Sequence, residues 1–522
     1  MPDTAAPVVG GKLGKLEELF VKNSIWLATG IIATAFVGRV AYSASCYLNP
    51  DEALHFDAAW SNSWLGAYEG SRALAHPPLF ILVLHGFLLL GHSEVILRLP
   101  SVLGGTAALG LVFAWVRRSL GEIPALAGLL FMAVSPAAVS ASTEVRQYGL
   151  LLCFTCGSLY ATERALSERS LLWAIVQGLL LLAAILTHYT ALILICSVDI
   201  YVLSRWLSDR FPRPVLLTFC AGQVVVAMAF GWLYLDHIRQ SSVFDRASLS
   251  YLGPFFYLRG SETLLGFAWR GLIGTFTYMV SHRLAIPSIL AILAGVGALL
   301  IGRIKGARLM GVLIVSPFVI GLISAIDQVF PFTGSRHQTY LLPFLAMGFS
   351  ATLTWIPRRL VPPLFLVGLA IAPIWAARNP PDNNPQRFPL RKMTEAIDYI
   401  NRTIPRDAPI FVDGQSGHII AYYLARDSFG PGTSGANSSS YERPGGHRII
   451  APQPFVPSFD PDNAIAKVNE SAAQAGIPSG APLWLVTVAW PGSEPLAVRL
   501  RADGLRAAET FGTISVIETI RD

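Results

Sequence analysis

Long uncharged runs of apolar residues recur through the first three quarters of the chain. Of its 522 residues, 53% are hydrophobic and only 14% are charged, whereas a soluble globular protein carries about 25% charged residues. Several runs are long enough, or nearly long enough, to cross a bilayer as helices of about 20 residues. The sequence therefore predicts a polytopic α-helical membrane protein.

The basic residues are distributed as membrane anchors. The formal net charge is +6, but Lys and Arg occur singly and in pairs between the apolar runs. This distribution is typical of spans whose cytoplasmic ends are flanked by positive charge. We therefore expect the chain to contact membrane lipids and no nucleic acid.

The sidedness of the charges predicts the topology. The Lys-bearing tail, residues 1–24, is expected in the cytoplasm, so the loop after the first span, residues 25–45, emerges on the outer side. The apolar segment 78–90 is too short to span and is expected to lie along the outer surface or to re-enter the membrane. Later spans alternate, giving about eleven within a membrane domain of residues 25–377.

The composition changes after the last apolar run. A linker rich in Pro and Asn comes first, and such helix breakers mark a boundary. Beyond it the apolar spacing is that of a soluble domain. Helices are predicted over 393–401, 417–426 and 464–475, and strands over 409–413, 483–489 and 511–519. Their alternation predicts an α/β domain over residues 378–522, on the side of the membrane opposite the N-terminus.

The loop after the first span contains an adjacent acidic pair, Asp51 and Glu52. Asn49 and Pro50 before it also fit the start of a short helix, with the acids in its first turn. Helix capping explains the local sequence, so a functional interpretation depends on other polar groups reaching the same side. Under the predicted topology that face also collects His55, Asp57, His76, Arg98, Glu144, Arg146, Gln147, Tyr148, His188, Tyr189, Asp236, His237, Arg336, His337 and Tyr340.

Ionisable side chains at membrane depth each cost a few kcal/mol, so they usually pair with one another or with a ligand. Arg makes bidentate contacts to phosphate, and carboxylates with aromatic residues suit a hydroxylated substrate. The alternative for Arg146 and Arg336 is a role as interfacial anchors, and for Tyr189 a place in an aromatic belt. Glu52 and His55 lie one helical turn apart and could hold a divalent cation, although spacing fixes no further ligand.

In their order along the chain these residues resemble the GT-C superfamily of membrane glycosyltransferases, in particular protein O-mannosyltransferases, lipid A aminoarabinose transferases and related bacterial enzymes. The matching features are the Asp51-Glu52 loop, His76-Pro77-Pro78-Leu79, Arg98-Leu99-Pro100-Ser101, Ser135-Pro136 followed by Glu144-Val145-Arg146-Gln147-Tyr148, Thr187-His188-Tyr189, and Arg336 ahead of Tyr340-Leu341-Leu342-Pro343.

The resemblance implies that an acidic residue of the first outer loop is the catalytic base and that a polyprenyl-phosphate sugar is the donor. On this chain Asp51 is then the base, and Glu52 supports it or holds the acceptor. The chain departs from the aminoarabinose transferases at His76, where they carry Lys, and at Leu54, where they carry Arg. Phosphate binding is therefore redistributed, and we assign it to Arg146 and Arg336.

The expected activity is an inverting transfer of a sugar to an acceptor hydroxyl at the outer leaflet of a bacterial cytoplasmic membrane. The acceptor is a lipid, a glycan or a protein. No cofactor is assigned, and a divalent cation is left open. The alternative is a multi-span transporter of a polar or lipid-linked substrate, which predicts ionisable groups near the midplane of two related halves. A receptor or scaffold leaves the acidic loop unexplained. Charges clustered at one face favour the enzyme.

Overall fold

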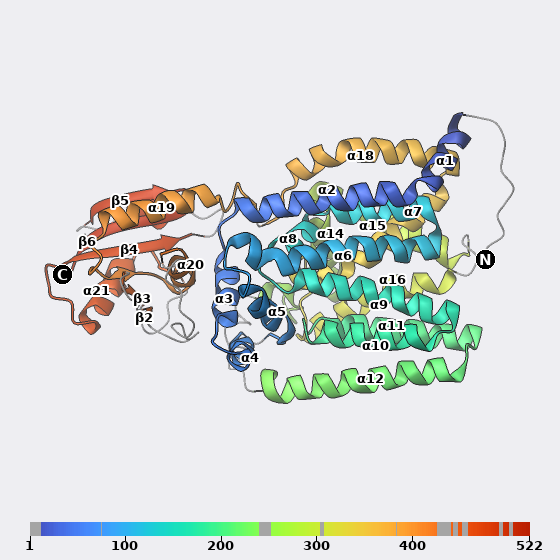
Figure 1. Ribbon diagram of the computed structural model, residues 1–522, viewed down its shortest axis with the longest axis horizontal. Helices are drawn as coiled ribbons and strands as arrows, with labels where there is room; N and C mark the ends of the chain where they lie inside the picture. The colour runs from blue at the N-terminus through green and yellow to red at the C-terminus, as the bar shows by residue number, and fades with distance from the viewer. Residues whose placement is uncertain are drawn as a thin grey trace.

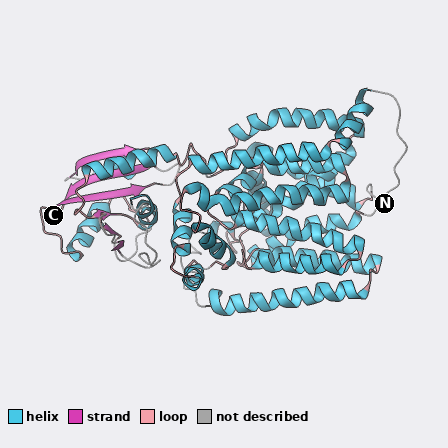
Figure 2. Cartoon of the chain, in the orientation of Figure 1, coloured by secondary structure: helices cyan, strands magenta, loops and turns pink. Residues whose placement is uncertain are grey.

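A bundle of long helices forms most of the molecule, and a small sheet domain lies beyond one end of it (Figures 1 and 2). The first helix lies at the other end of the bundle, opposite the sheet domain. The computed structural model describes residues 12–74, 76–239, 252–302, 307–382, 384–424, 440–441, 447–451, 458–489, 494–500 and 505–521.

The α-helices of the bundle and of the layer between bundle and sheet are α1 (Lys12–Lys22), α2 (Ser24–Ser45), α3 (Pro50–Ala59), α4 (Trp64–Ala73), α5 (Leu79–Leu88), α6 (Glu94–Leu120), α7 (Glu122–Val134), α8 (Pro136–Thr143), α9 (Tyr148–Glu168), α10 (Leu171–Ile185), α11 (Ala191–Asp209), α12 (Arg213–Leu233), α14 (Leu264–Met279), α15 (Ala285–Leu300), α16 (Arg308–Ile326), α17 (Leu342–Thr352) and α18 (Val361–Arg378). Short turns of other helix types are η1 (Tyr234–Ile238), η3 (Gly253–Phe255), η4 (His282–Leu284), η5 (Arg336–Leu341), η6 (Leu353–Trp355) and η7 (Arg358–Leu360).

Seven helices in the described ranges are long and apolar enough to cross a bilayer, and the bent pair α7–α8 would make an eighth. The predicted polytopic helical protein is therefore confirmed, whereas the count of about eleven spans is not. Three expected spans are not among these helices. Helices α10 and α17 have only 15 and 11 residues, which is less than a span needs, and α9, with 21 residues, is not apolar enough, since it contains Glu163, Arg164 and Glu168. The segment expected to be too short to span forms α5, with 10 residues.

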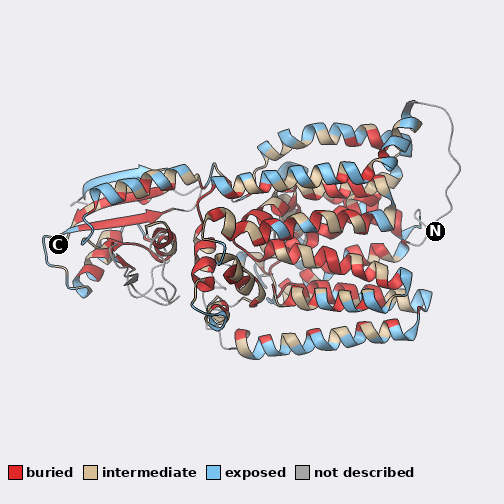
Figure 3. Cartoon of the chain, viewed as in Figure 1, coloured by how far each residue is buried: buried red, intermediate tan, exposed pale blue. Residues whose placement is uncertain are grey.

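The outermost helices present apolar side chains to their surroundings. Much of α12 and α18 is exposed along its length (Figure 3), including Leu217, Met228, Leu364 and Ile371. Exposed apolar faces of this size are unusual on a soluble monomer, and within a bilayer they would face lipid tails. Within each helix the backbone N–H and C=O groups hydrogen-bond to one another, which a segment that crosses a bilayer requires.

The sheet domain has six strands in the order β2-β3-β1-β4-β6-β5. They are β1 (Ile410–Phe411), β2 (Ser440–Tyr441), β3 (Ile449–Ile450), β4 (Pro482–Val488), β5 (Leu505–Phe511) and β6 (Ile514–Ile520), and the helices with them are α19 (Leu390–Thr403), α20 (Gly414–Leu424), α21 (Ala464–Gln474) and α22 (Leu496–Arg499). Strands β3, β1 and β4 are parallel, and the remaining pairs are antiparallel. The predicted C-terminal α/β domain is confirmed.

One apolar core joins the sheet domain to the layer formed by α3 and α5. Ala53 and Phe56 of α3 and Phe80 of α5 belong to the same buried cluster as Ile419 and Tyr422 of α20. A separate cluster fills the bundle. The sheet domain is therefore packed against the segment that carries the acidic pair.

Candidate active site

The helix that carries the acidic pair begins with a capping box. The Asn49 side chain accepts a hydrogen bond from the Glu52 N–H (3.0 Å), and the Asn49 N–H donates to Glu52 Oε2 (2.9 Å). Pro50 occupies the first turn, where its missing N–H costs nothing. The capping alternative is thus correct for Asn49 and Glu52, and it leaves the Asp51 carboxylate free to point elsewhere.

Asp51 forms ion pairs with two arginines from distant parts of the chain. Its Oδ2 atom lies 2.6 Å from Arg146 Nη1 and 2.6 Å from Arg336 Nη2. Arg146 follows α8, and Arg336 begins η5. The side chains of Asp51 and Arg336 are 29% and 26% exposed, whereas that of Arg146 is 4% exposed. The structure brings together the three residues to which the sequence assigns catalysis and phosphate binding.

The electrostatics of this trio favour an ionised carboxylate with an excess of positive charge. Burial alone would raise the pKa of Asp51, but Arg146 and Arg336 outweigh it and hold that pKa well below its usual range. One carboxylate neutralises only one of the two guanidinium groups. Among the described residues, Arg146 Nε has no hydrogen-bond partner. The trio can therefore still attract a second anion.

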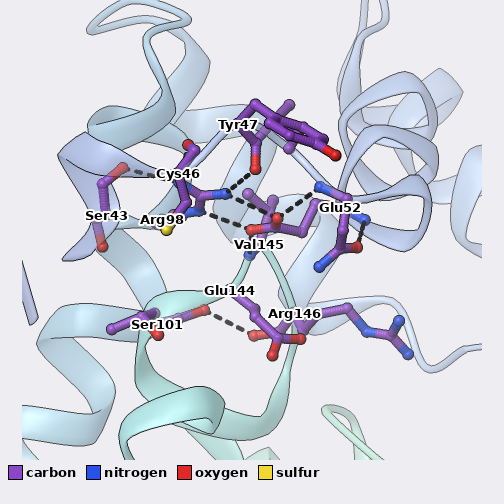
Figure 4. A network of polar contacts seen from close by, with 12 residues as sticks. Ser43, Cys46, Tyr47, Glu52, Arg98, Ser101, Glu144, Val145 and Arg146 are labelled. Atoms are coloured by element: carbon purple, nitrogen blue, oxygen red, sulfur yellow. Dashed lines mark hydrogen bonds and ion pairs between the residues drawn. The ribbon is translucent and has the colours of Figure 1, made fainter. Parts of the chain in front are cut away.

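Glu52, the neighbour of Asp51 in the sequence, forms a fully buried ion pair with Arg98 (Figure 4). Arg98 Nε and Nη2 donate to the two Glu52 oxygens at 2.7 and 2.8 Å, and both side chains are 0% exposed. Arg98 also donates to three backbone carbonyls of residues 43–47, and the Val145 N–H donates to Glu52 Oε1 (2.8 Å). The pair fixes the segments that carry Asp51 and Arg146 relative to each other.

This geometry changes the interpretation of two residues singled out in the sequence. Glu52 was expected to assist Asp51 or hold the acceptor, and Arg98 to bind substrate. Neither side chain has exposed surface. Their charged atoms form hydrogen bonds with one another and with backbone groups. We therefore propose that both support the site without contacting a substrate.

Four imidazole rings and Tyr148 form a cluster beside the trio. The ring centroids of His55 and His76 are 5.3 Å apart, those of His76 and His188 are 6.3 Å apart, and those of His188 and His337 are 5.8 Å apart. Tyr148 lies 5.3 Å from His188 and within 3.5 Å (Oη to Nδ1) of His337. The Arg146 guanidinium lies over the Tyr148 ring at 5.6 Å. Residues from four separate connections thus share one wall.

The imidazoles of this wall are neutral near pH 7. Burial, with the positive field of Arg146, lowers the pKa of His55 and of His188 to about 3. The pKa values of His76 and His337 also lie well below the usual range, chiefly because of burial. Neutral rings can accept or donate hydrogen bonds to hydroxyl groups. His76 therefore supplies no charge for a phosphate, which leaves that task to Arg146 and Arg336.

The one-turn spacing of Glu52 and His55 does not make a cation site. The Glu52 carboxylate is used by Arg98, and His55 Nδ1 lies 2.7 Å from the Asp51 carbonyl oxygen. Across the ranges that the structure describes, no group of three or more His, Cys, Asp or Glu side chains is arranged to hold a metal ion.

Two predicted residues stand apart from this network. Tyr189 and Tyr340 occupy the same connections as His188 and Arg336, but their rings belong to the buried core of the bundle. Neither hydroxyl has a hydrogen-bond partner in the described part of the chain. The structure therefore does not bring them into contact with the ionised trio.

Glu144 is a buried carboxyl group next to the trio, visible beside Arg146 in Figure 4. It accepts a hydrogen bond from Ser140 Oγ (2.5 Å). Burial raises its pKa to about 7, against the opposing effect of Arg336. Ser140 also lines a polar cavity of about 490 Å³, together with Thr277, Tyr278 and Asp382. Glu144 thus contacts a residue that lines this cavity.

We expect Glu144→Gln to reduce the pH dependence of stability. The folded protein keeps a proton on Glu144 up to about pH 7, whereas the unfolded chain loses it near 4.5. Unfolding therefore releases a proton between these values, and the stability that Glu144 contributes falls as pH rises from 4.5 to 7. Thermal unfolding in detergent at several pH values should show a flatter profile for the variant. Glu69→Gln, at an exposed position on α4, should keep the wild-type slope, and an unchanged slope in Glu144→Gln would contradict the expectation.

An apolar groove of about 540 Å³ adjoins the polar cavity, with Val280 lining both. It runs between α7, α14, α15, α17 and α18 and is lined by side chains such as Leu130, Phe131, Phe349 and Leu364. In the parts of the chain that the structure describes, the linings of the cavity and the groove contain no residue of the trio or of the ring cluster, and the hydrogen bond from Ser140 to Glu144 links the polar cavity to their surroundings.

Comparison with known proteins agrees with this architecture. The sequence matches the family "Dolichyl-phosphate-mannose-protein mannosyltransferase" over residues 75–233, and no curated protein matches it. The fold is similar to that of ArnT from Cupriavidus metallidurans bound to undecaprenyl phosphate (TM-score 0.57, 13% identity, 94% of this chain and 97% of that chain). The apo structure of the same protein gives a TM-score of 0.55 at 14% identity, with 94% and 97% coverage. At these identities the likeness concerns the fold.

Proposed function

We propose that the chain is a membrane glycosyltransferase of the GT-C superfamily, of the O-mannosyltransferase and ArnT type, and that it moves a sugar from a polyprenyl phosphate to an acceptor hydroxyl. The family match over residues 75–233 and the likeness in fold to ArnT support this proposal. The observation that carries this proposal is the pairing of one outer-loop carboxylate, Asp51, with two arginines. A base and a phosphate-binding group are the two elements that such a transfer requires.

We propose that donor binding releases the base. In the free protein Arg146 and Arg336 contact the same oxygen of Asp51. A donor phosphate would compete for these two cations, since the trio carries one excess positive charge and Arg146 has a spare donor. Once the arginines contact the phosphate, Asp51 loses its counterions and becomes a stronger base.

The transfer itself is one displacement. The acceptor oxygen attacks the anomeric carbon, Asp51 takes the hydroxyl proton, and the bond from that carbon to the phosphate oxygen breaks. The phosphate leaves as an anion that Arg146 and Arg336 stabilise, so no protein acid is needed. A single displacement inverts the anomeric configuration, and a base of this kind contributes roughly 10²–10⁴-fold.

We assign sugar binding to the wall of neutral rings. His55, His76, His188 and Tyr148 offer hydrogen-bonding atoms without charge, and His55 Nε2 has no partner within the described residues. A buried polar atom left unpaired costs free energy unless a ligand or water meets it. The isoprenoid chain is assigned to the apolar groove, whose lining is lipid-like.

We further propose that the membrane domain covers residues 25–377 and that residues 378–522 form an extracytoplasmic domain of a bacterial inner-membrane protein. The Lys-bearing helix α1 and the sheet domain lie at opposite ends of the bundle (Figure 1). Basic residues favour the cytoplasmic side, which puts Asp51 and the sheet domain on the outer side. The site would then meet donor and acceptor at the outer leaflet.

Arg146→Ala and Arg336→Ala should each weaken donor binding by about 10- to 100-fold, since a hydrogen bond to a charged group contributes about 1.5–3 kcal/mol. Equilibrium binding of a polyprenyl-phosphate sugar to purified protein measures this. Arg270→Ala is the matched control, because Arg270 forms an exposed ion pair with Glu262. Donor affinity unchanged in both site variants would return the two arginines to the role of interfacial anchors.

The proposed function as a whole is tested by deleting the gene and analysing lipids and envelope glycans by mass spectrometry. We expect one glycosyl unit to be missing and a polyprenyl-phosphate sugar to accumulate. If the protein were a transporter, another enzyme would attach the glycosyl unit. Purified protein incubated with donor and acceptor would then form no product.

A further inference from the structure

The C-terminal domain contacts the helix that carries Asp51 through a hydrogen bond between an imidazole and a buried carboxylate. His418 Nδ1 of α20 lies 2.5 Å from Asp57 Oδ2 of α3. The Asp57 side chain is 4% exposed and that of His418 is 13% exposed. The two residues are 361 positions apart in the chain, and α20 packs directly on α3. In Figure 1 α3 lies between the bundle and this domain.

The same domain also holds the segment that leads into α3. The Leu48 N–H donates to the Tyr423 hydroxyl oxygen (3.0 Å), and the Tyr47 N–H donates to the Phe388 carbonyl oxygen (2.9 Å). The Tyr47 hydroxyl lies 2.8 Å from Thr513 Oγ1. The backbone on the N-terminal side of α3 is therefore fixed by three separate parts of the C-terminal domain.

Apolar packing completes the contact. The Phe56 ring meets the Tyr422 ring edge to face at a centroid distance of 5.0 Å, an arrangement that contributes beyond area burial. Ala53, Phe56 and Tyr422 lie in one buried cluster. The C-terminal domain thus covers the side of α3 that the bundle leaves open.

A helix as short as α3 depends on such contacts. It has 10 residues, and isolated helices of that length are marginal. The Glu52–Arg98 pair anchors its first turn, whereas Asp57, one and a half turns later, is anchored by the C-terminal domain. A misplacement of a reacting group by 1 Å can lower a reaction rate about 10²-fold. Both contacts therefore help to fix the position of the Asp51 carboxylate.

We propose that His418 is a positioning residue for the transfer reaction: through Asp57 it holds α3 in the orientation that places Asp51 at the acceptor hydroxyl. The role of the C-terminal domain is then to complete the active site. This inference rests on the proposed function for its catalytic consequence, whereas its structural consequence can be measured separately.

The test uses the full chain with His418→Ala, His418→Asn and Asp57→Ala. For His418→Ala we expect amide hydrogen exchange in residues 50–59 to rise at least tenfold and kcat to fall about tenfold, with KM for the donor within twofold. His418→Asn, which can still donate to Asp57 from a similar position, should recover most of both effects. The double variant His418→Ala/Asp57→Ala should be no worse than either single variant, because the two residues act as a pair.

Lys467→Ala is the matched control, since Lys467 forms an ion pair with Glu470 (2.9 Å) in the same domain and is part of α21, away from α3. It should leave exchange and kcat unchanged. Exchange in α3 unaltered by His418→Ala would overturn the inference, as would equal loss in the Lys467 control. If α3 loosens as expected but even the wild-type chain transfers no sugar, the positioning of α3 stands and the proposed function fails.

Discussion

Asp51→Asn should reduce sugar transfer by about 10²–10⁴-fold, the contribution of a general base, while the protein stays folded. The amide has nearly the same shape but cannot take the acceptor proton. It also removes the negative charge that Arg146 and Arg336 share in the free protein. Donor binding should therefore be unchanged or tighter, because the arginines no longer have to exchange a carboxylate for a phosphate.

Initial rates with purified protein, together with donor titration, separate these two effects. Asp398→Asn serves as a control, since Asp398 is exposed on α19. A folded Asp51→Asn protein with near-normal turnover would remove Asp51 from the role of base. Lost donor binding in place of lost turnover would indicate that the carboxylate orients the arginines.

Arg98→Ala should be the most damaging substitution for folding. It leaves the Glu52 carboxylate buried without its counterion, and also leaves three backbone carbonyls without their donor. Breaking a buried ion pair by removing one partner costs about 3–5 kcal/mol, a large part of the stability of a typical domain. We expect little folded protein, or a strongly lowered Tm in detergent.

The matched control is Arg117→Ala. Arg117 forms an ion pair of the same length with Glu122 (2.7 Å), but its side chain is 42% exposed, and exposed pairs contribute about 0–1 kcal/mol. Replacing both buried residues, as in Glu52→Gln/Arg98→Met, should recover part of the loss, because no unpaired charge remains. If the Arg98 and Arg117 variants were equally stable, the Glu52–Arg98 pair would not contribute more to stability than an exposed ion pair.

The convergence of Asp51, Arg146 and Arg336 could be predicted because the local sequence indicates on which side of the membrane each connection lies. Positive charges next to apolar runs orient each span, and orientation sorts the connections into two faces. Sidedness does not indicate, however, which residues on one face form ion pairs or hydrogen bonds with each other. Arg98 was therefore grouped with the substrate-binding residues, although it is the buried counterion of Glu52.

Other features had no local signal. The hydrogen bond between Asp57 and His418 joins residues 361 positions apart, and nothing around His418 distinguishes it from any residue of a soluble helix. Strand β5 was not predicted, because Leu505–Phe511 contains Arg, Glu and two Ala residues, which are not typical of strands. It forms by pairing with β6.

The common core of α3, α5 and α20 makes the molecule indivisible at its linker. A chain severed within residues 379–385 would leave Phe56 and Phe80 on one fragment and Tyr422 on the other, each with an apolar face turned to water. We therefore expect neither fragment to fold stably without the other. Exchange of tail domains between related enzymes would succeed only where the incoming domain brings the matching surface for α3 with it.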